Sequence, residues 1–211
     1  MPSKRRRTRE REATHDRILD AARELFVERG VEATTMRAIA DRLECTAPAI
    51  YHHFADKQSL LRELVTQDIG ALGASFQRLR QVADPVERLI KLGMAYVRFG
   101  LEHPQHYRLL FMTPGAKRDI DGDGVGRIER HPESDAYGIV RATVTEAIQA
   151  GRFHGLYGDP ERVSQLCWAS VHGLISLHAV FADDAWIEWR DVETSAERML
   201  AALVDGMMDD G

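Results

Sequence analysis

The feature that most constrains the fold is a pair of short helical segments separated by only three residues. The first covers about residues 36–43 and carries apolar side chains at helical spacing. The second covers about residues 47–53, with Thr46 as a candidate N-cap and Pro48 in the first turn, where a missing N–H costs little. Two helices joined by so short a turn, residues 44–46, cross at a steep angle, so the sequence predicts a helix-turn-helix.

The rest of the chain also predicts helices, because no run shows the strict alternation of a half-buried strand. The pairs Asp84-Pro85 and Asp159-Pro160 are each typical of an N-cap followed by the first helical residue. Besides the helix-turn-helix, we expect helices over about 14–29, from 57, over 85–102, 104–112 and 134–150, from 160, and over an apolar seam at 196–207. The predicted fold class is therefore all-α.

The charge of the chain is unevenly distributed. The net charge of −5 by itself argues against a nucleic-acid partner, but residues 1–12 hold six basic and two acidic residues, a net charge of +4. A basic segment ahead of an acidic body is typical of a chain that contacts nucleic acid through its N-terminus. The alternative is a solvated, disordered tail.

Cysteine usage and hydropathy indicate a cytoplasmic protein with no membrane partner. Cys45 and Cys167 form no CxxC pair, which favours free thiols in a reducing compartment. Cys45 could sense redox state, but a half-buried small side chain is the simpler interpretation. The apolar stretches are far shorter than the roughly 20 residues that span a bilayer.

Three histidine or acidic patterns resemble metal sites only in part. His52 and His53 diverge by about 100° on a helix, whereas ligands of one metal need a spacing of three or four residues. His103 and His106 have that spacing, but Pro104 places His103 before the helix and no cysteine or carboxylate cluster completes a site. The segment 119–130 resembles a calcium loop but ends in an arginine where glutamate is required. We therefore predict no metal and no cofactor.

The segment ILDAARELFVERGVEATTMRAIADRLECTAPAIYHHFADKQSLL, within about residues 14–62, resembles the N-terminal domain of the TetR family of bacterial transcriptional regulators. The resemblance implies that the third helix enters the major groove of DNA. By position it implies DNA contacts from Thr35 and Arg37 in the second helix, from Thr46, Ala47 and Pro48 at the start of the third, and from Tyr51, His52 and Lys57 to phosphates.

One position departs from the family pattern. Glu44 stands in the turn where the family often has glycine, and a glutamate resists a left-handed conformation by about 1 kcal/mol. We therefore expect the turn to be shaped slightly differently, with the Glu44 side chain directed away from DNA.

The C-terminal part resembles one group of TetR-family ligand domains. The resemblance rests on HPQHYRLLF at 103–111 and CWASVHGLISL at 167–177, which contains a Trp-x-x-x-His-Gly pattern. It implies a ligand pocket, for which the aromatic candidates and one histidine are Tyr96, Phe99, Tyr107, Phe111, Trp168 and His172. It also implies a dimer interface from the last two helices, with Leu174, Met199, Leu200, Leu203, Val204 and Met207 as candidates. Plain core packing is the alternative for each of the pocket residues.

These observations predict a basic disordered arm over residues 1–13, a helix-turn-helix DNA-binding domain over 14–60, and a helical ligand-binding and dimerisation domain over 61–211. The predicted function is a homodimeric transcriptional repressor that a small-molecule effector releases from a palindromic, double-stranded operator. The alternatives are an activator of the same fold, an architectural DNA binder, or an enzyme that uses His172 as a base. We predict that the protein is not an enzyme, because the sequence contains none of the familiar catalytic or nucleotide-binding motifs and no convincing set of metal ligands.

Overall fold

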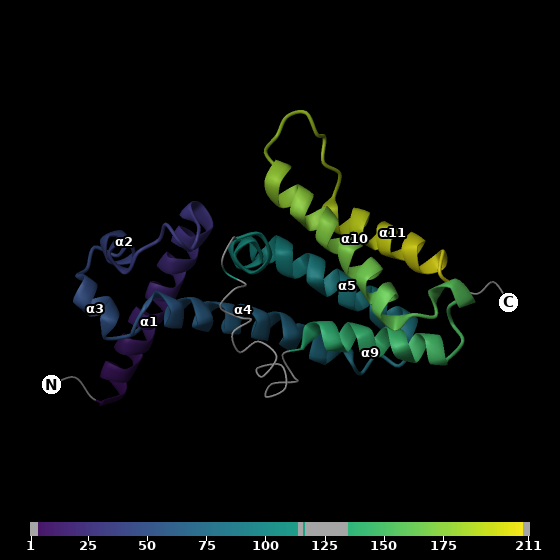
Figure 1. Ribbon diagram of the computed structural model, residues 1–211, viewed down its shortest axis with the longest axis horizontal. Coiled ribbons are helices and arrows are strands. Elements are labelled where there is room, and N and C mark those ends of the chain that lie inside the picture. The colour runs from purple at the N-terminus through teal and green to yellow at the C-terminus, as the bar shows by residue number, and fades with distance from the viewer. Residues whose placement is uncertain (1–3, 114–115, 117–134, 209–211) are drawn as a thin grey trace. The chain divides into compact units, whose positions relative to one another are not determined.

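The computed structural model is a chain of helices that divides into two compact units (Figure 1). The described residues are 4–113, 116 and 135–208. The first unit comprises residues 1–68 and 105–127, and the second comprises residues 69–104 and 128–211. Over the described residues there is no β-strand, only an isolated antiparallel bridge between Phe153 and Met208, so the predicted all-α fold is confirmed. The acidic segment 119–130 lies outside the described residues.

The first unit contains the predicted helix-turn-helix. Its helices are α1 (Lys4–Arg29), α2 (Met36–Arg42), α3 (Ala47–Tyr51), the first half of α4 (Lys57–Leu79), most of α6 (Pro104–Tyr107) and the π-helix η1 (Arg108–Met112). Helix α1 ends where expected, because Gly30 adopts a φ of 81° and its N–H donates to the Phe26 carbonyl. The hydroxyl of buried Thr34 lies 2.8 Å from the Gly30 carbonyl oxygen and fixes the turn that follows.

The basic N-terminal segment differs from the prediction. Helix α1 begins at Lys4, so residues 4–13, which we expected to be disordered, continue the helix. Arginine and glutamate are good helix formers, and Arg6 and Glu10 form an i,i+4 ion pair of 2.7 Å on its surface. Local helix propensity therefore outweighs the repulsion among the arginines here.

A buried charge cluster joins three helices of the first unit. Asp68 on α4 is 1% exposed and accepts hydrogen bonds from Arg23 on α1, at 3.0 and 3.3 Å. The Nδ1 atom of His106 on α6 lies 2.7 Å from the same carboxylate, and Asp20 accepts a further hydrogen bond from Arg23 at 2.9 Å. A charge buried in this way is tolerated only while it is paired, so these contacts hold α1, α4 and α6 together.

The second unit contains the second half of α4 and the helices α5 (Pro85–Glu102), α9 (Ala136–Gln149), α10 (Pro160–Phe181) and α11 (Val192–Asp205), with a short 3₁₀ helix η3 (Gly155–Tyr157). Both predicted cap-plus-proline signals are confirmed. The Asp84 carboxylate accepts from two backbone N–H groups of α5, and Asp159 does the same for α10. The hydrogen bonds from Arg152 and the helix N-terminus lower the pKa of Asp84.

No helix among the described residues is both long and apolar enough to cross a membrane.

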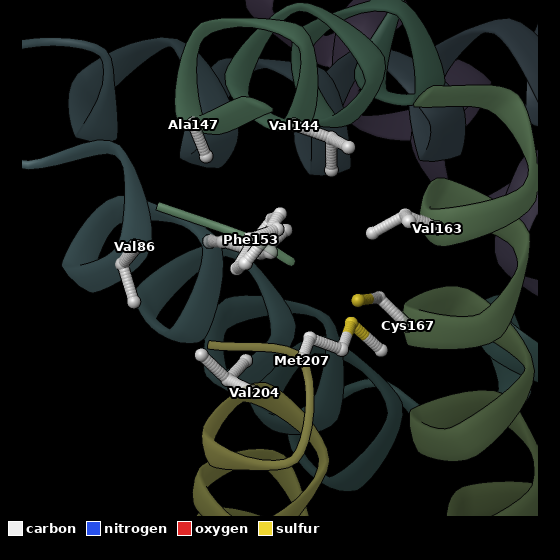
Figure 2. Packing of buried hydrophobic residues seen from close by; sticks show 9 residues of the cluster. Val86, Val144, Ala147, Phe153, Val163, Cys167, Val204 and Met207 are labelled. Atoms are coloured by element: carbon white, nitrogen blue, oxygen red, sulfur yellow. The ribbon is translucent and has the colours of Figure 1, made fainter. Parts of the chain in front are cut away.

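The core of the second unit is built from all four of its major helices. Figure 2 shows Phe153 among side chains that point toward one another from these helices. The buried cluster is Val86, Leu89, Val144, Ala147, Phe153, Val163, Cys167, Val204 and Met207. Burial in this apolar surrounding raises the pKa of the Cys167 thiol to about 11. Cys45, by contrast, is exposed rather than half-buried as expected.

We predict that Asp68→Ala destabilises the protein by about 3–5 kcal/mol, because it leaves the buried Arg23 guanidinium without its main partner. Urea unfolding followed by circular dichroism would measure the loss. Glu10→Ala is the matched control, since it removes a carboxylate from an exposed ion pair and should cost about 0.5 kcal/mol or less. Equal effects of the two substitutions would contradict the structural role of the buried pair.

Candidate nucleic-acid interface and aromatic cluster

The turn between α2 and α3 has the left-handed residue that a glycine usually supplies. Glu44 has a φ of 53°, and the next N–H, of Cys45, donates to the Ala40 carbonyl at 3.0 Å. The expectation that glutamate would give the turn a different shape is therefore wrong. Glu44 thus has the left-handed backbone conformation that glycine adopts easily, and a residue with a Cβ adopts it at the cost of some strain. Its side chain is exposed and adds a negative charge beside α3.

Helix α3 exposes nearly every residue that the sequence assigned to DNA contact. Ile50 is fully buried and holds the helix on the unit, whereas Thr46, Pro48 and His52 are exposed and Ala47 is half-buried. Tyr51 is 53% exposed, which is unusual for an aromatic side chain in a packed helix. Thr46 has the backbone conformation of an N-cap, but its side chain makes no capping hydrogen bond. Hydrogen-bond donors are therefore exposed at both ends of α3, at Thr46 before it and at Tyr51 and His52 at its end.

Helix α2 adds two further exposed residues and is fixed on α1. The Thr35 hydroxyl accepts the N–H of Ala38 at 3.1 Å and so caps α2, while Arg37 is exposed. Arg42 at the other end donates to Glu24 and Glu28 of α1, at 2.9 and 2.8 Å. Its hydrogen bond lowers the pKa of Glu28. Arg37 thus lies on a helix whose orientation is set by ionic contacts as well as by packing.

Lys57 differs from the other predicted DNA contacts. Its ammonium donates to the Val31 carbonyl at 2.7 Å and to the Glu32 carbonyl at 3.3 Å. The side chain is half-buried and joins the start of α4 to the turn after α1. These contacts let Lys57 position the helix-turn-helix, and its role as a phosphate contact stays a prediction.

The two adjacent histidines have different surroundings. His52 is exposed, while His53 is half-buried, with its ring 6.0 Å from that of His15. The His15 ring also stacks on Phe54 at 4.6 Å. Burial is the main cause of a lowered pKa at His53, and the charges of His15, Arg11 and His52 add to it. Among the described residues, no group of three or more histidine, cysteine or acidic side chains could hold a metal ion.

In the second unit, four of the six predicted pocket residues lie on α5 and α10. The Tyr96 hydroxyl lies 2.9 Å from Nδ1 of His172, and Ser176 Oγ lies 3.3 Å from Nε2 of the same ring. The rings of Trp168 and His172 are 5.9 Å apart, and Phe99 is buried elsewhere on α5. The cluster thus has an aromatic wall and a chain of three polar tips, which we call the Tyr96–His172 cluster.

The other two predicted pocket residues belong to the first unit. Tyr107 is fully buried, and its ring lies 5.1 Å from that of Phe111.

The second unit also has a cleft that the sequence did not indicate. It has a volume of about 430 Å³ and lies between α9 and the start of α10. It is lined largely by polar residues, among them Arg141, Glu146 and Glu161, and by none of the predicted aromatic residues.

The predicted dimer interface is partly wrong. Leu200, Val204 and Met207 are each 1% exposed and pack inside the second unit, so they cannot also form a contact surface. Leu174, Met199 and Leu203 are only half-buried. The apolar seam of α11 therefore covers the core of its own protomer, which a spacing of three and four residues cannot distinguish from an interface.

An exposed apolar stripe lies instead on α10. Leu166, Leu177 and Val180 are 41%, 54% and 56% exposed. Their spacing, continued by Ser170 and Gly173, keeps them on one side of the helix, away from the buried Cys167, Val171 and Ile175. A Cβ added at Gly173 would meet no atom within 4 Å. We call these five positions the α10 stripe.

Comparison with known families places the chain. The family model for bacterial regulatory proteins of the tetR family matches residues 18–64, and that for the tetracyclin repressor-like C-terminal domain matches residues 89–203. The second match alone covers more than half of the chain, and the protein therefore belongs to the TetR family. The resemblance seen in the sequence is confirmed, while the narrower Trp-x-x-x-His-Gly grouping stays a prediction.

Individual relatives agree with this assignment. The chain is 37% identical over 105 residues to the HTH-type transcriptional repressor KstR2 of Mycobacterium tuberculosis, covering 48% of this chain and 50% of KstR2. It is 34% identical over 102 residues to the HTH-type transcriptional activator FasR of Mycolicibacterium smegmatis, covering 48% and 47%. The chain thus aligns with about half the length of these curated relatives. Its fold is that of FadR from Bacillus subtilis, solved in complex with stearoyl-CoA, with a TM-score of 0.68, 19% identity and coverage of 90% and 98%.

We predict that Glu44→Gly stabilises the first unit by about 0.5–1 kcal/mol, because it removes the strain of a left-handed non-glycine residue. The greater conformational entropy that glycine gives the unfolded chain offsets only part of this gain. Urea unfolding would measure the shift. Glu44→Ala is the matched control, since it removes the charge but keeps the Cβ and the strain. If the alanine variant gains as much as the glycine variant, charge rather than backbone strain is the cause.

Proposed function

We propose that this protein is a transcriptional repressor that binds a palindromic DNA operator as a homodimer and releases it when a small molecule binds the second unit. The observation that carries the proposal is the exposed face of α3 and its two caps, where Thr46, Pro48, Tyr51 and His52 are all exposed. Membership of the TetR family and the likeness to the repressor KstR2 support it. Such a protein would act in the cytoplasm, where it meets its operator.

The residues of α3 favour particular kinds of DNA contact. The hydroxyls of Thr46 and Tyr51 and the imidazole of His52 can donate to phosphate oxygens, which sets the register on the duplex. Ala47 and Pro48 have almost no hydrogen-bonding capacity, so sequence would be read through thymine methyl groups and DNA shape. Arg37 on α2 is the side chain best suited to a bidentate contact with guanine.

The α10 stripe is the surface that we assign to the homodimer. An isologous interface needs a self-complementary patch, and a stripe with apolar ends and a small Gly173 at its centre allows two copies of α10 to approach closely. Two reading helices in such a dimer would lie about 34–36 Å apart, one turn of DNA, on a palindromic site. The half-buried Leu174, Met199 and Leu203 can border this contact.

The Tyr96–His172 cluster is the site that we assign to the effector. Its aromatic wall and its few polar tips suit an organic molecule with a hydrophobic body and one hydrogen-bonding group. Phe99 lies on the same helix as Tyr96, but its ring lies 5.6 Å from that of His103, so the roles of Phe99, Tyr107 and Phe111 in this site are left as sequence predictions. If the effector bound here weakens DNA binding by the first unit, the coupling free energy between the two sites is typically about 1–3 kcal/mol.

Activation is the second candidate, favoured by the likeness to the activator FasR. Both relatives match over similar lengths and at similar identity. Transcription in vitro from a promoter that carries the operator separates the two, because a repressor lowers the yield of transcript and an activator raises it. A catalytic role for His172 is not proposed, because the sequence contains none of the familiar catalytic motifs.

Titration against a labelled duplex from the protein's own upstream region, with scrambled DNA as competitor, tests the proposal. We predict that Tyr51→Ala weakens binding about 10-fold or more, because it removes one phosphate contact and part of the exposed face of α3. Tyr51→Phe, which keeps the ring, should show the part of the loss that is due to the hydroxyl. Equal binding to specific and scrambled DNA, unchanged by Tyr51→Ala, would refute the assignment of α3 to DNA.

We predict that Leu177→Arg converts the dimer to a monomer, because Leu177 is exposed on the α10 stripe and the proposed dimer would bury the introduced charge in an apolar contact. Light scattering coupled to size exclusion measures the mass. Leu156→Arg is the control, since Leu156 is 83% exposed and lies outside the α10 stripe. A dimer that survives Leu177→Arg, and also survives Gly173→Arg, would move the interface to another surface.

A further inference from the structure

The N-terminal turns of α1 form a strongly basic surface of the first unit. Arg5, Arg6, Arg7, Arg9 and Arg11 are all exposed. Residues 1–12 carry a net charge of +4, in a chain whose net charge is −5. Apart from the ion pair between Arg6 and Glu10, no ion pair of these arginines is found among the described residues. A surface of this kind attracts a polyanion.

This basic surface is helical, which restricts how it can meet DNA. An α-helix with its side chains is about 10–12 Å wide, whereas the minor groove of B-DNA is about 6 Å wide. The segment therefore cannot enter the minor groove as an extended arm does. It can lie along the phosphate backbone, where guanidinium groups make bidentate contacts with phosphate oxygens.

The position of the segment relates it to the reading helix. His15 on α1 stacks on Phe54 and lies near His53, both just after α3, and the charge of Arg11 contributes to the lowered pKa of His53. Figure 1 shows the N-terminal turns of α1 running on past α3 within the first unit. From His15 to Lys4 the helix is about 16 Å long at 1.5 Å per residue, the length of about five base pairs.

The arginines repel one another in the free protein. The first turn of α1 contains no acidic residue, although the positive end of the helix dipole lies there. Arg5 and Arg9, and likewise Arg7 and Arg11, are like-charge pairs at a spacing of four residues, which destabilises a helix slightly. Phosphates would relieve both forms of repulsion, so the helical segment is better suited to a bound polyanion than to water.

We propose that the arginine-rich N-terminal turns of α1 bind the phosphate backbone of DNA outside the half-site that α3 reads. This inference rests on the proposed function, and it extends the footprint on each side of the operator. The contact is electrostatic and independent of sequence, so it adds affinity and steepens the salt dependence of binding without adding specificity.

The test compares two duplexes, one limited to the palindrome that footprinting defines and one with about ten base pairs of unrelated sequence added on each side. The variant is Arg5→Ala/Arg7→Ala/Arg9→Ala/Arg11→Ala, which keeps good helix formers throughout. The control, Arg78→Ala/Arg141→Ala/Arg162→Ala/Arg198→Ala, removes the same charge from exposed positions of the second unit. Affinity is measured over about 50–200 mM salt, the range in which phosphate contacts have a large effect.

For the wild type and the control we expect tighter binding and a steeper salt slope on the longer duplex. For the N-terminal variant we expect that difference to disappear. The slope should fall by about 0.9 for each phosphate that is no longer neutralised, or by about 4 if two arginines of each protomer bind phosphate. An unchanged slope on the longer duplex, or an equal loss on both duplexes, overturns the inference while the proposed function stands. Absence of specific binding by the wild type overturns the proposed function, and the inference with it.

Discussion

The buried ion pair between Arg23 and Asp68 is the interaction on which the first unit depends. It joins α1 to α4, and His106 brings α6 to the same carboxylate. Helix α1 in turn holds α2 through Arg42, and Lys57 ties the start of α4 to the turn after α1. The exposed residues of α3 are therefore presented by a frame in which polar contacts fix directions that apolar packing alone would leave adjustable.

Much of this fold could be predicted from the sequence, because its signals are local. The aspartate-proline pairs begin α5 and α10, Gly30 ends α1, and apolar spacing identifies the helix-turn-helix. Local signals could not show what covers an apolar stripe. Leu200 and Val204 have the periodicity of an interface, yet neighbouring helices bury them, while Leu177 on α10 is left exposed. Burial depends on partners that are distant in the sequence.

The candidate site could likewise be predicted where local spacing decides exposure, but not where contacts are distant in the sequence. The exposure of Tyr51 and His52 follows from the inward direction of Ile50 and Phe54, which the spacing gives. The contacts that Lys57 makes within the protein could not be predicted, because its acceptors are the carbonyls of Val31 and Glu32, 26 and 25 residues earlier. Glu44 shows the opposite case, in which the turn geometry prevails over the preference of the residue that occupies it.

Helix α10 carries three different surfaces around one axis. Val163, Cys167 and Val171 face the core, Trp168, His172 and Ser176 belong to the Tyr96–His172 cluster, and Leu166 and Leu177 are exposed. If the Tyr96–His172 cluster binds the effector and the α10 stripe forms the dimer, effector binding and dimerisation both involve α10. The two equilibria are then linked thermodynamically. Sensitivity to the effector would then vary with protein concentration, so a cell that makes more of the regulator would also change the dose at which it responds.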